Sequence, residues 1–157
     1  MAKPKSIYVV DTCSFTTLQR AYSIDVFPSV WRKVEELILD GKIVSVDEVY
    51  HEICRQDDDL SKWAKIQQGI FLPLSDEVQD QAKEIVNNYI KIVDFKNNKS
   101  GADPFVIAQA VLLSGTVVTE EKHSGGQEKM KIPDVCDALK LPYMNFMNMM
   151  KAEGLRF

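Results

Sequence analysis

Acidic side chains follow the short apolar runs of this sequence or open an apolar helix, at places where a parallel sheet would expose them. These acids are Asp11, Glu48, Glu52, Asp103, Glu120 and Glu121. In open parallel sheets, ligands bind beyond the carboxyl ends of the strands, so acids placed there are candidates for function. Carboxylates that converge repel one another unless a cation neutralises them. The sequence therefore predicts a cation site built from aspartate and glutamate.

The ligand types indicate which cation this is. Mg²⁺ and Mn²⁺ bind oxygen ligands in octahedral geometry, whereas zinc sites use cysteine and histidine. The chain has three cysteines and two histidines, which form neither a CxxC pair nor an HExxH motif. Bound Mg²⁺ or Mn²⁺ lowers the pKa of a coordinated water and stabilises charge on a phosphodiester, alone or with a second ion about 4 Å away. The predicted chemistry is phosphodiester hydrolysis.

Each of these acids also has a purely structural explanation. Asp11 can cap the turn DTCS, and Asp103 directly precedes Pro104, a standard way to begin a helix. The four glutamates can be solvated surface charges, as most glutamates are. Capping and metal binding are compatible, so both explanations stay open for each residue taken alone. The ordered set of acids is what favours a shared site.

Short strands alternate with helices along the whole chain. Patterns of apolar residues predict strands at 6–10, 42–46, 116–118 and 142–144, and helices at 27–39, 47–56, 57–68, from 75 onward, from 103 onward, at 132–140 and at 145–155. Residues 69–74 are expected to form an extended connector, because Pro73 disfavours a central strand. Such alternation favours a parallel sheet with right-handed crossovers.

Composition limits the classes of protein that the chain can belong to. With 157 residues, 45% of them apolar, we expect a single domain over residues 1–157 with a proper core. The first apolar run is too short for a signal peptide or a membrane span, so we expect a cytoplasmic protein without a membrane partner. The net charge of −4 excludes capture of nucleic acid by a generally basic surface. Candidate local cations are Lys96, Lys99, Lys122, Lys129 and Lys131.

The order of these motifs resembles the PIN-domain nucleases, which include the VapC-like toxins. The resemblance rests on VVDTCS, VDEVYHEI, SGADPFVIAQA and VVTEEK, and it covers nearly the whole length. It implies an α/β fold, a three-layer α/β/α sandwich with a mostly parallel central sheet.

The resemblance also implies roles for individual residues. PIN nucleases hold their metal with an aspartate after the first strand, a glutamate on an early helix, an aspartate that begins a late helix and an acid in a Thr-x-acid turn. The corresponding catalytic and metal-binding residues are Asp11, Glu52, Asp103 and Glu121, with Glu48, Glu120 and Asp134 as alternates and with Thr12 and Thr119 as hydroxyl residues that orient the acids. Two departures are Cys13, where the family often has serine or asparagine, and Glu120-Glu121 in place of asparagine and aspartate.

By this resemblance the chain is expected to be a Mg²⁺- or Mn²⁺-dependent endoribonuclease and the toxin of a toxin–antitoxin pair. Its partners would be RNA, an antitoxin protein and a second copy of itself in a homodimer. Two other functions stay open: a non-catalytic PIN-like module that binds protein or RNA, and a structure-specific DNA nuclease.

Overall fold

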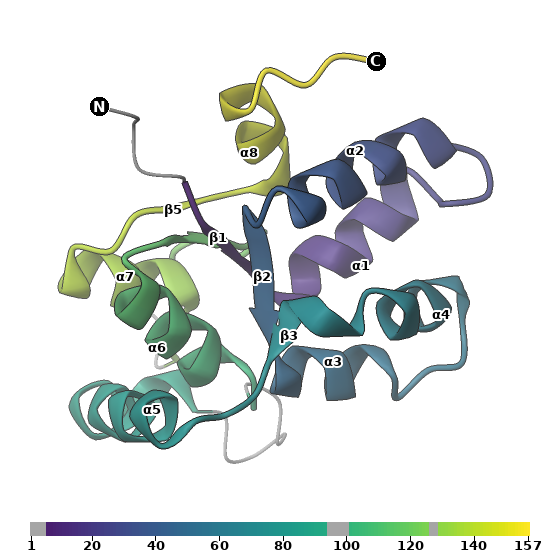
Figure 1. Cartoon of the computed structure of the whole chain (residues 1–157). Helices are drawn as coiled ribbons and strands as arrows, with labels where there is room; N and C mark the ends of the chain where they lie inside the picture. Colours follow the sequence, from purple (N-terminus) through teal and green to yellow (C-terminus); the bar gives the residue numbers. More distant parts are fainter. Residues whose placement is uncertain (1–5, 94–100, 126–128) are drawn as a thin grey trace.

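A five-stranded parallel sheet forms the centre of the protein (Figure 1), with the strand order β3-β2-β1-β4-β5. The computed structural model describes residues 6–93, 101–125 and 129–157. The strands are β1 (Tyr8–Val10), β2 (Ile43–Val46), β3 (Phe71–Leu72), β4 (Thr116–Val118) and β5 (Tyr143–Met144). Every pair of neighbours is parallel, so all five carboxyl ends lie at one edge of the sheet.

Helices cover both faces of this sheet, with α1 and α2 on one side and α5 and α6 on the other (Figure 1). The α-helices are α1 (Thr12–Ala21), α2 (Pro28–Leu39), α3 (Asp47–Ile53), α4 (Asp59–Ile66), α5 (Asp76–Asn88), α6 (Asp103–Leu113), α7 (Ile132–Leu139) and α8 (Phe146–Ala152), with 3₁₀ turns η1 (Gln68–Ile70) and η2 (Ile90–Ile92). The predicted three-layer α/β/α arrangement is confirmed, and its sheet is parallel throughout. No helix within the described ranges is both long and apolar enough to cross a membrane.

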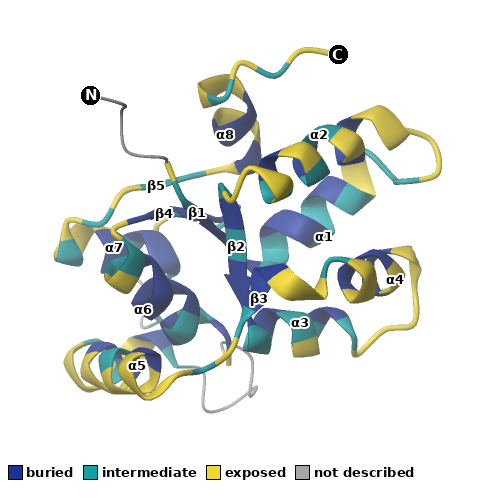
Figure 2. Ribbon diagram, in the orientation of Figure 1, coloured by how far each residue is buried: buried dark blue, intermediate teal, exposed yellow. Residues whose placement is uncertain are grey.

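The central strands are apolar because they are covered on both faces. Each residue of β1 is buried, and β4 is buried at Val117 and Val118. Continuous apolar runs are typical of such doubly covered parallel strands. Figure 2 shows the buried residues along the strands and on the helix surfaces that face them. Helix α6 packs against β1, β2 and β4 and is the apolar helix that the sequence predicts after Asp103.

The structure corrects one predicted element. Residues 69–74 were expected to be a connector, but Phe71 and Leu72 form β3, which pairs with β2. The strand occupies an edge of the sheet and ends directly before Pro73. At that position the missing N–H of proline costs no ladder hydrogen bond. The candidate cations Lys96 and Lys99 lie outside the described residues.

An aromatic cluster fixes α1, the helix that begins after Asp11, to its neighbours. The Phe15 side chain is fully buried, and its ring centroid lies 5.6 Å from that of Trp63 on α4 and 6.1 Å from that of Phe71 on β3. Trp63 in turn packs edge-on against Trp31 of α2 at 4.9 Å. Three helices and the edge strand therefore depend on the same packed rings.

We predict that Phe15→Ala lowers the free energy of unfolding by about 3–5 kcal/mol, because it removes a fully buried ring and leaves a cavity. Urea unfolding monitored by tryptophan fluorescence measures the change. Leu39→Ala, at a side chain that is 87% exposed, serves as the control and should change stability by less than about 0.5 kcal/mol. Equal stabilities of the two variants would contradict the role given to this cluster.

Candidate metal centre

Asp11 lies at the carboxyl end of the central strand β1 and is only 3% exposed. Its Oδ1 accepts the backbone N–H of Thr12 at 2.8 Å, so the residue does cap α1. Its Oδ2 accepts hydrogen bonds from the Cys13 thiol at 3.1 Å and from Thr119 Oγ1 at 3.3 Å. A carboxylate offers about four lone-pair positions, so these contacts leave capacity for a cation.

Asp103 and Glu121 bring their carboxylates to the same place. Asp103 is the first residue of α6, whose N-cap residue, Ala102, has no side chain that could cap the helix. Glu121 follows β4, and its Oε2 accepts the backbone N–H of Ile132, the first residue of α7, at 3.0 Å. One carboxylate oxygen from each of Asp11, Asp103 and Glu121 lies within 4.8 Å of the other two. This carboxylate cluster has the donor set and proximity that a divalent metal requires.

Glu52 lines the same cleft but lies outside the three-residue cluster. Its Oε2 accepts the Thr12 hydroxyl at 2.6 Å, and its Oε1 accepts the Ala102 N–H at 3.2 Å. The residue therefore connects α3 to the starts of α1 and α6. All four predicted acids face one cleft of about 540 Å³, and three of them are within reach of a single ion.

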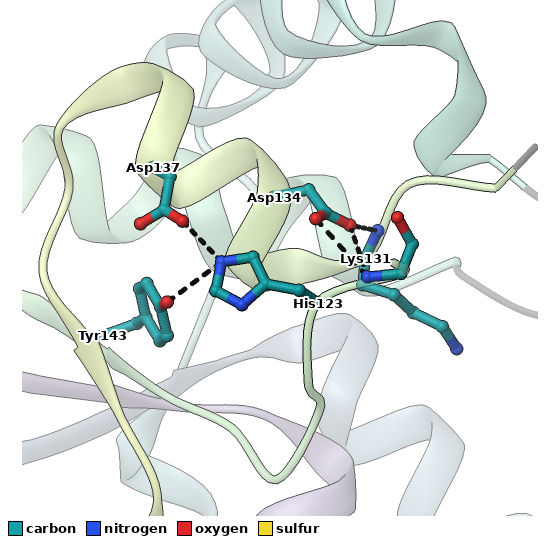
Figure 3. Close-up of polar contacts among 6 residues, drawn as sticks. His123, Lys131, Asp134, Asp137 and Tyr143 are labelled. Atoms are coloured by element: carbon teal, nitrogen blue, oxygen red, sulfur yellow. Dashed lines mark hydrogen bonds and ion pairs between the residues drawn. The ribbon is translucent and has the colours of Figure 1, made fainter. Parts of the chain in front are cut away.

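Glu48, Glu120 and Asp134, the alternates for the metal-binding residues, do not belong to the carboxylate cluster. Glu120 Oε1 accepts the N–H of Phe146, the first residue of α8, at 2.9 Å. Glu48 is half-buried on α3, and it is not among the described residues that line the cleft. Asp134 accepts the backbone N–H groups of Lys131 at 2.7 Å and Ser124 at 3.2 Å (Figure 3). The structure therefore distinguishes Glu120 from Glu121 by the partner of each carboxylate.

Hydrogen bonds from uncharged side chains orient the cluster. Thr12 binds Glu52, and Thr119 binds Asp11 and also accepts the Glu121 N–H at 3.1 Å. The Cys13 sulfur accepts the Glu120 N–H at 3.3 Å. Burial, followed by the neighbouring carboxylate of Asp11, raises the pKa of the Cys13 thiol above its ordinary range, so the thiol stays protonated and can donate to Asp11.

A set of contacts that sequence reasoning missed holds the segment carrying Glu121. His123 Nε2 lies 2.5 Å from Asp137 Oδ2 on α7 and 3.2 Å from the Tyr143 hydroxyl on β5 (Figure 3). These partners are 14 and 20 residues away in the chain. No local pattern links residues at such separations, so only the fold reveals the contact. Together with Asp134, the histidine fastens this segment to α7 and β5.

Burial and mutual repulsion disfavour the ionised form of the cluster. Burial raises the pKa of Asp11 to about 6, with the charge of Glu121 adding to the effect. Burial, and then the charges of Asp11, Glu121 and Glu52, raise the pKa of Asp103 to about 9. Without a cation Asp103 retains its proton near neutral pH, and a divalent cation would compete with that proton for the carboxylate oxygens.

Comparisons with known proteins agree with this fold. A family model described as "Domain of unknown function (DUF4411)" matches residues 8–157. A chain in the crystal structure of VapBC2 from Rickettsia felis, bound to a DNA fragment from their promoter, is similar over 89% of this chain and 98% of its own length, with a TM-score of 0.52 and 15% identity. None of the curated proteins matches the sequence. At this identity the structural likeness shows the fold alone, which is PIN-like.

We predict that the metal-free protein loses stability as pH rises from about 4 to 9. The folded pKa values of Asp11, about 6, and Asp103, about 9, lie above the unfolded value near 3.9. Their stabilising contribution is complete below the unfolded pKa and is lost as pH rises through the folded values. Asp103→Asn should remove the loss of stability at the upper end of this pH range. There the release of one proton lowers the free energy of unfolding by up to about 1.4 kcal/mol per pH unit.

Urea unfolding in EDTA at several pH values measures this dependence. Asp76→Asn, a matched substitution in the exposed first turn of α5, is the control and should follow the wild type. A decline as steep in Asp103→Asn as in the wild type would show that Asp103 is not the titrating group.

Proposed function

The chain belongs to the family described as "Domain of unknown function (DUF4411)", and we propose that this member is a Mg²⁺- or Mn²⁺-dependent endoribonuclease. The observation that carries the proposal is the cluster of Asp11, Asp103 and Glu121 oxygens within 4.8 Å of one another at the carboxyl edge of the sheet. An all-oxygen donor set fits Mg²⁺ or Mn²⁺ rather than zinc. Burial and the neighbouring carboxylates raise the pKa values of Asp11 and Asp103, and a bound cation would oppose both effects.

In this proposal the three clustered carboxylates hold the metal, and Glu52 acts beside them. A bound divalent cation supplies Lewis-acid activation of water and charge stabilisation at the phosphodiester. Asp11 stays oriented because its carboxylate accepts hydrogen bonds from Thr12, Cys13 and Thr119. Glu52 accepts hydrogen bonds from the Thr12 hydroxyl and from the N–H of Ala102, the N-cap residue of α6, and so fixes Asp103 relative to Asp11. The acids are thus preorganised for substrate.

We further propose a biological setting, by analogy with the structural neighbour. That neighbour was solved as the VapBC2 complex with promoter DNA. The analogy suggests that this chain is a cytoplasmic toxin held inactive by an antitoxin protein, and fold-level analogy is all that supports it. Growth arrest on expression, relieved by a co-expressed partner, would support this setting, and its absence would remove the toxin role while leaving the nuclease chemistry open.

The first test of the nuclease is metal-dependent cleavage. We expect purified protein to cut single-stranded RNA with Mg²⁺ or Mn²⁺, EDTA to abolish cutting, and Asp11→Asn to lower the rate by at least about 100-fold. Asparagine can still accept the Thr12 N–H, so the variant should remain folded. Gel assays and circular dichroism check both points, with Asp76→Asn as the matched active control.

Each contrary result of that assay has a separate meaning. Cleavage that survives EDTA or Asp11→Asn would contradict the metal mechanism. Metal binding without cleavage of any nucleic acid would indicate a non-catalytic module. Selective cutting of flap DNA offered in parallel would indicate a DNA nuclease.

The second test uses the adjacent glutamates of the Thr-x-acid turn. We expect Glu121→Gln to weaken Mn²⁺ binding at least about tenfold, because it removes a charged ligand, and Glu120→Gln to leave it nearly unchanged. The Glu120 variant is a matched control, since the glutamine oxygen can still accept the Phe146 N–H. Calorimetric titration with Mn²⁺ measures both. A larger loss of Mn²⁺ affinity in Glu120→Gln than in Glu121→Gln would show that Glu120 is the ligand.

A further inference from the structure

Cationic side chains surround the acidic floor of the cleft. Arg55, Lys129 and Lys131 line it together with the four acids. The remaining described residues of the lining are Thr12, Cys13, Thr16 and Gln56. The chain has a net charge of −4, so this local group of cations is not the consequence of a generally basic surface. Lys122, another cation considered from sequence, is exposed and does not line the cleft.

Arg55 and Lys131 line the cleft from elements that follow strands on opposite sides of β1. Arg55 follows α3, the helix after β2, whereas Lys131 is the N-cap of α7 and lies on the segment after β4. Strand β1, which ends at Asp11, lies between β2 and β4 in the sheet. A linear anion that crosses the acidic cluster would therefore meet one cation on each side of it.

Neither of these two side chains forms an ion pair with a described residue. The four ion pairs among the described residues are Lys33–Glu36, Lys42–Glu153, His51–Asp47 and His123–Asp137. At Lys131, the neighbouring Asp134 binds the backbone N–H, as Figure 3 shows, and no ion pair to the ammonium is formed. Lys129 differs, because its charge acts on Asp103 and opposes the burial that raises the pKa of that acid. Arg55 and Lys131 are thus available to an external anion.

The chemistry of the lining indicates which part of a nucleic acid is bound. No aromatic side chain occurs among the described lining residues, so none of them offers an aromatic ring on which a base could stack. Arginine and lysine contact phosphate oxygens and position a strand without reading its sequence. Asp11 is only 3% exposed at the floor, and a single strand can bend toward it more readily than a stiff duplex.

We infer that Arg55 and Lys131 are positioning residues that hold the phosphates of single-stranded RNA on either side of the carboxylate cluster. The inference rests on the proposed function for the identity of the substrate. It adds the path of the RNA across the cleft, which runs between the end of α3 and the start of α7. It also assigns the contacts of these two side chains to the phosphate backbone, which carries no sequence information.

The test is a salt titration of RNA binding to the Asp11→Asn protein in Mg²⁺, so that cleavage does not interfere. Each phosphate contact contributes about 0.7 to the slope of log affinity against log salt for a single strand. We expect Arg55→Gln and Lys131→Gln each to lower the slope by about 0.7 and the double variant by about 1.4. Arg55→Lys keeps the charge and should restore the slope. Fluorescence anisotropy with a labelled oligonucleotide provides the measurement.

Matched controls separate this role from a general effect of charge. Arg32→Gln on α2 and Lys62→Gln on α4 alter exposed cations that do not line the cleft, and both should keep the parent slope. Single-stranded DNA of the same sequence should show the same losses, because the contacts are to phosphates. Tighter binding of a duplex than of the single strand would overturn the assignment.

The outcome is independent of whether the chain cleaves RNA. If the wild type does not cut but the slopes fall as expected, the nuclease proposal fails and the positioning role stands. If the parent binds no RNA, or if both cleft variants keep its slope, the positioning role is wrong even for an active nuclease.

Discussion

The repulsion among buried carboxylates is the constraint on which the site depends. A parallel sheet ordered β2-β1-β4 at its centre directs the acids that follow these strands to one edge, and α6 adds Asp103 to them. Burial adds to this repulsion in disfavouring the ionised carboxylates, and both raise the pKa values of Asp11 and Asp103. A fold that retains this arrangement in its interior incurs a cost at neutral pH, which a bound cation would offset.

Helix starts stabilise the same acids. Backbone N–H groups at the beginnings of α1, α6, α7 and α8 donate to Asp11, Glu52, Glu121 and Glu120 respectively. Such groups carry partial positive charge and favour anions. In the case of Asp11, the carboxylate that caps α1 is therefore also the one that we propose as a metal ligand. Glu120 has the structural role alone, because its carboxylate accepts the N–H of Phe146 at the start of α8 and is not part of the cluster.

The sequence predicts the parts of this arrangement that depend on local pattern. Strands of β-branched residues that end in Asp11 or before Glu120 are evident from periodicity, and so is the apolar helix after Asp103. The choice between Glu120 and Glu121 is not evident, since it depends on which helix start each carboxylate reaches. Strand β3 was missed because Pro73 disfavours a central strand, whereas β3 is an edge strand that ends before the proline. The His123 contacts were missed because their partners lie on other elements.

The most direct test of a metal at this cluster is an anomalous difference map from a crystal soaked in Mn²⁺. The account predicts a peak within bonding distance of carboxylate oxygens from Asp11, Asp103 and Glu121, at about 2.1–2.3 Å. The account would be contradicted if the three side chains were ordered and no peak lay between them after a soak in millimolar Mn²⁺.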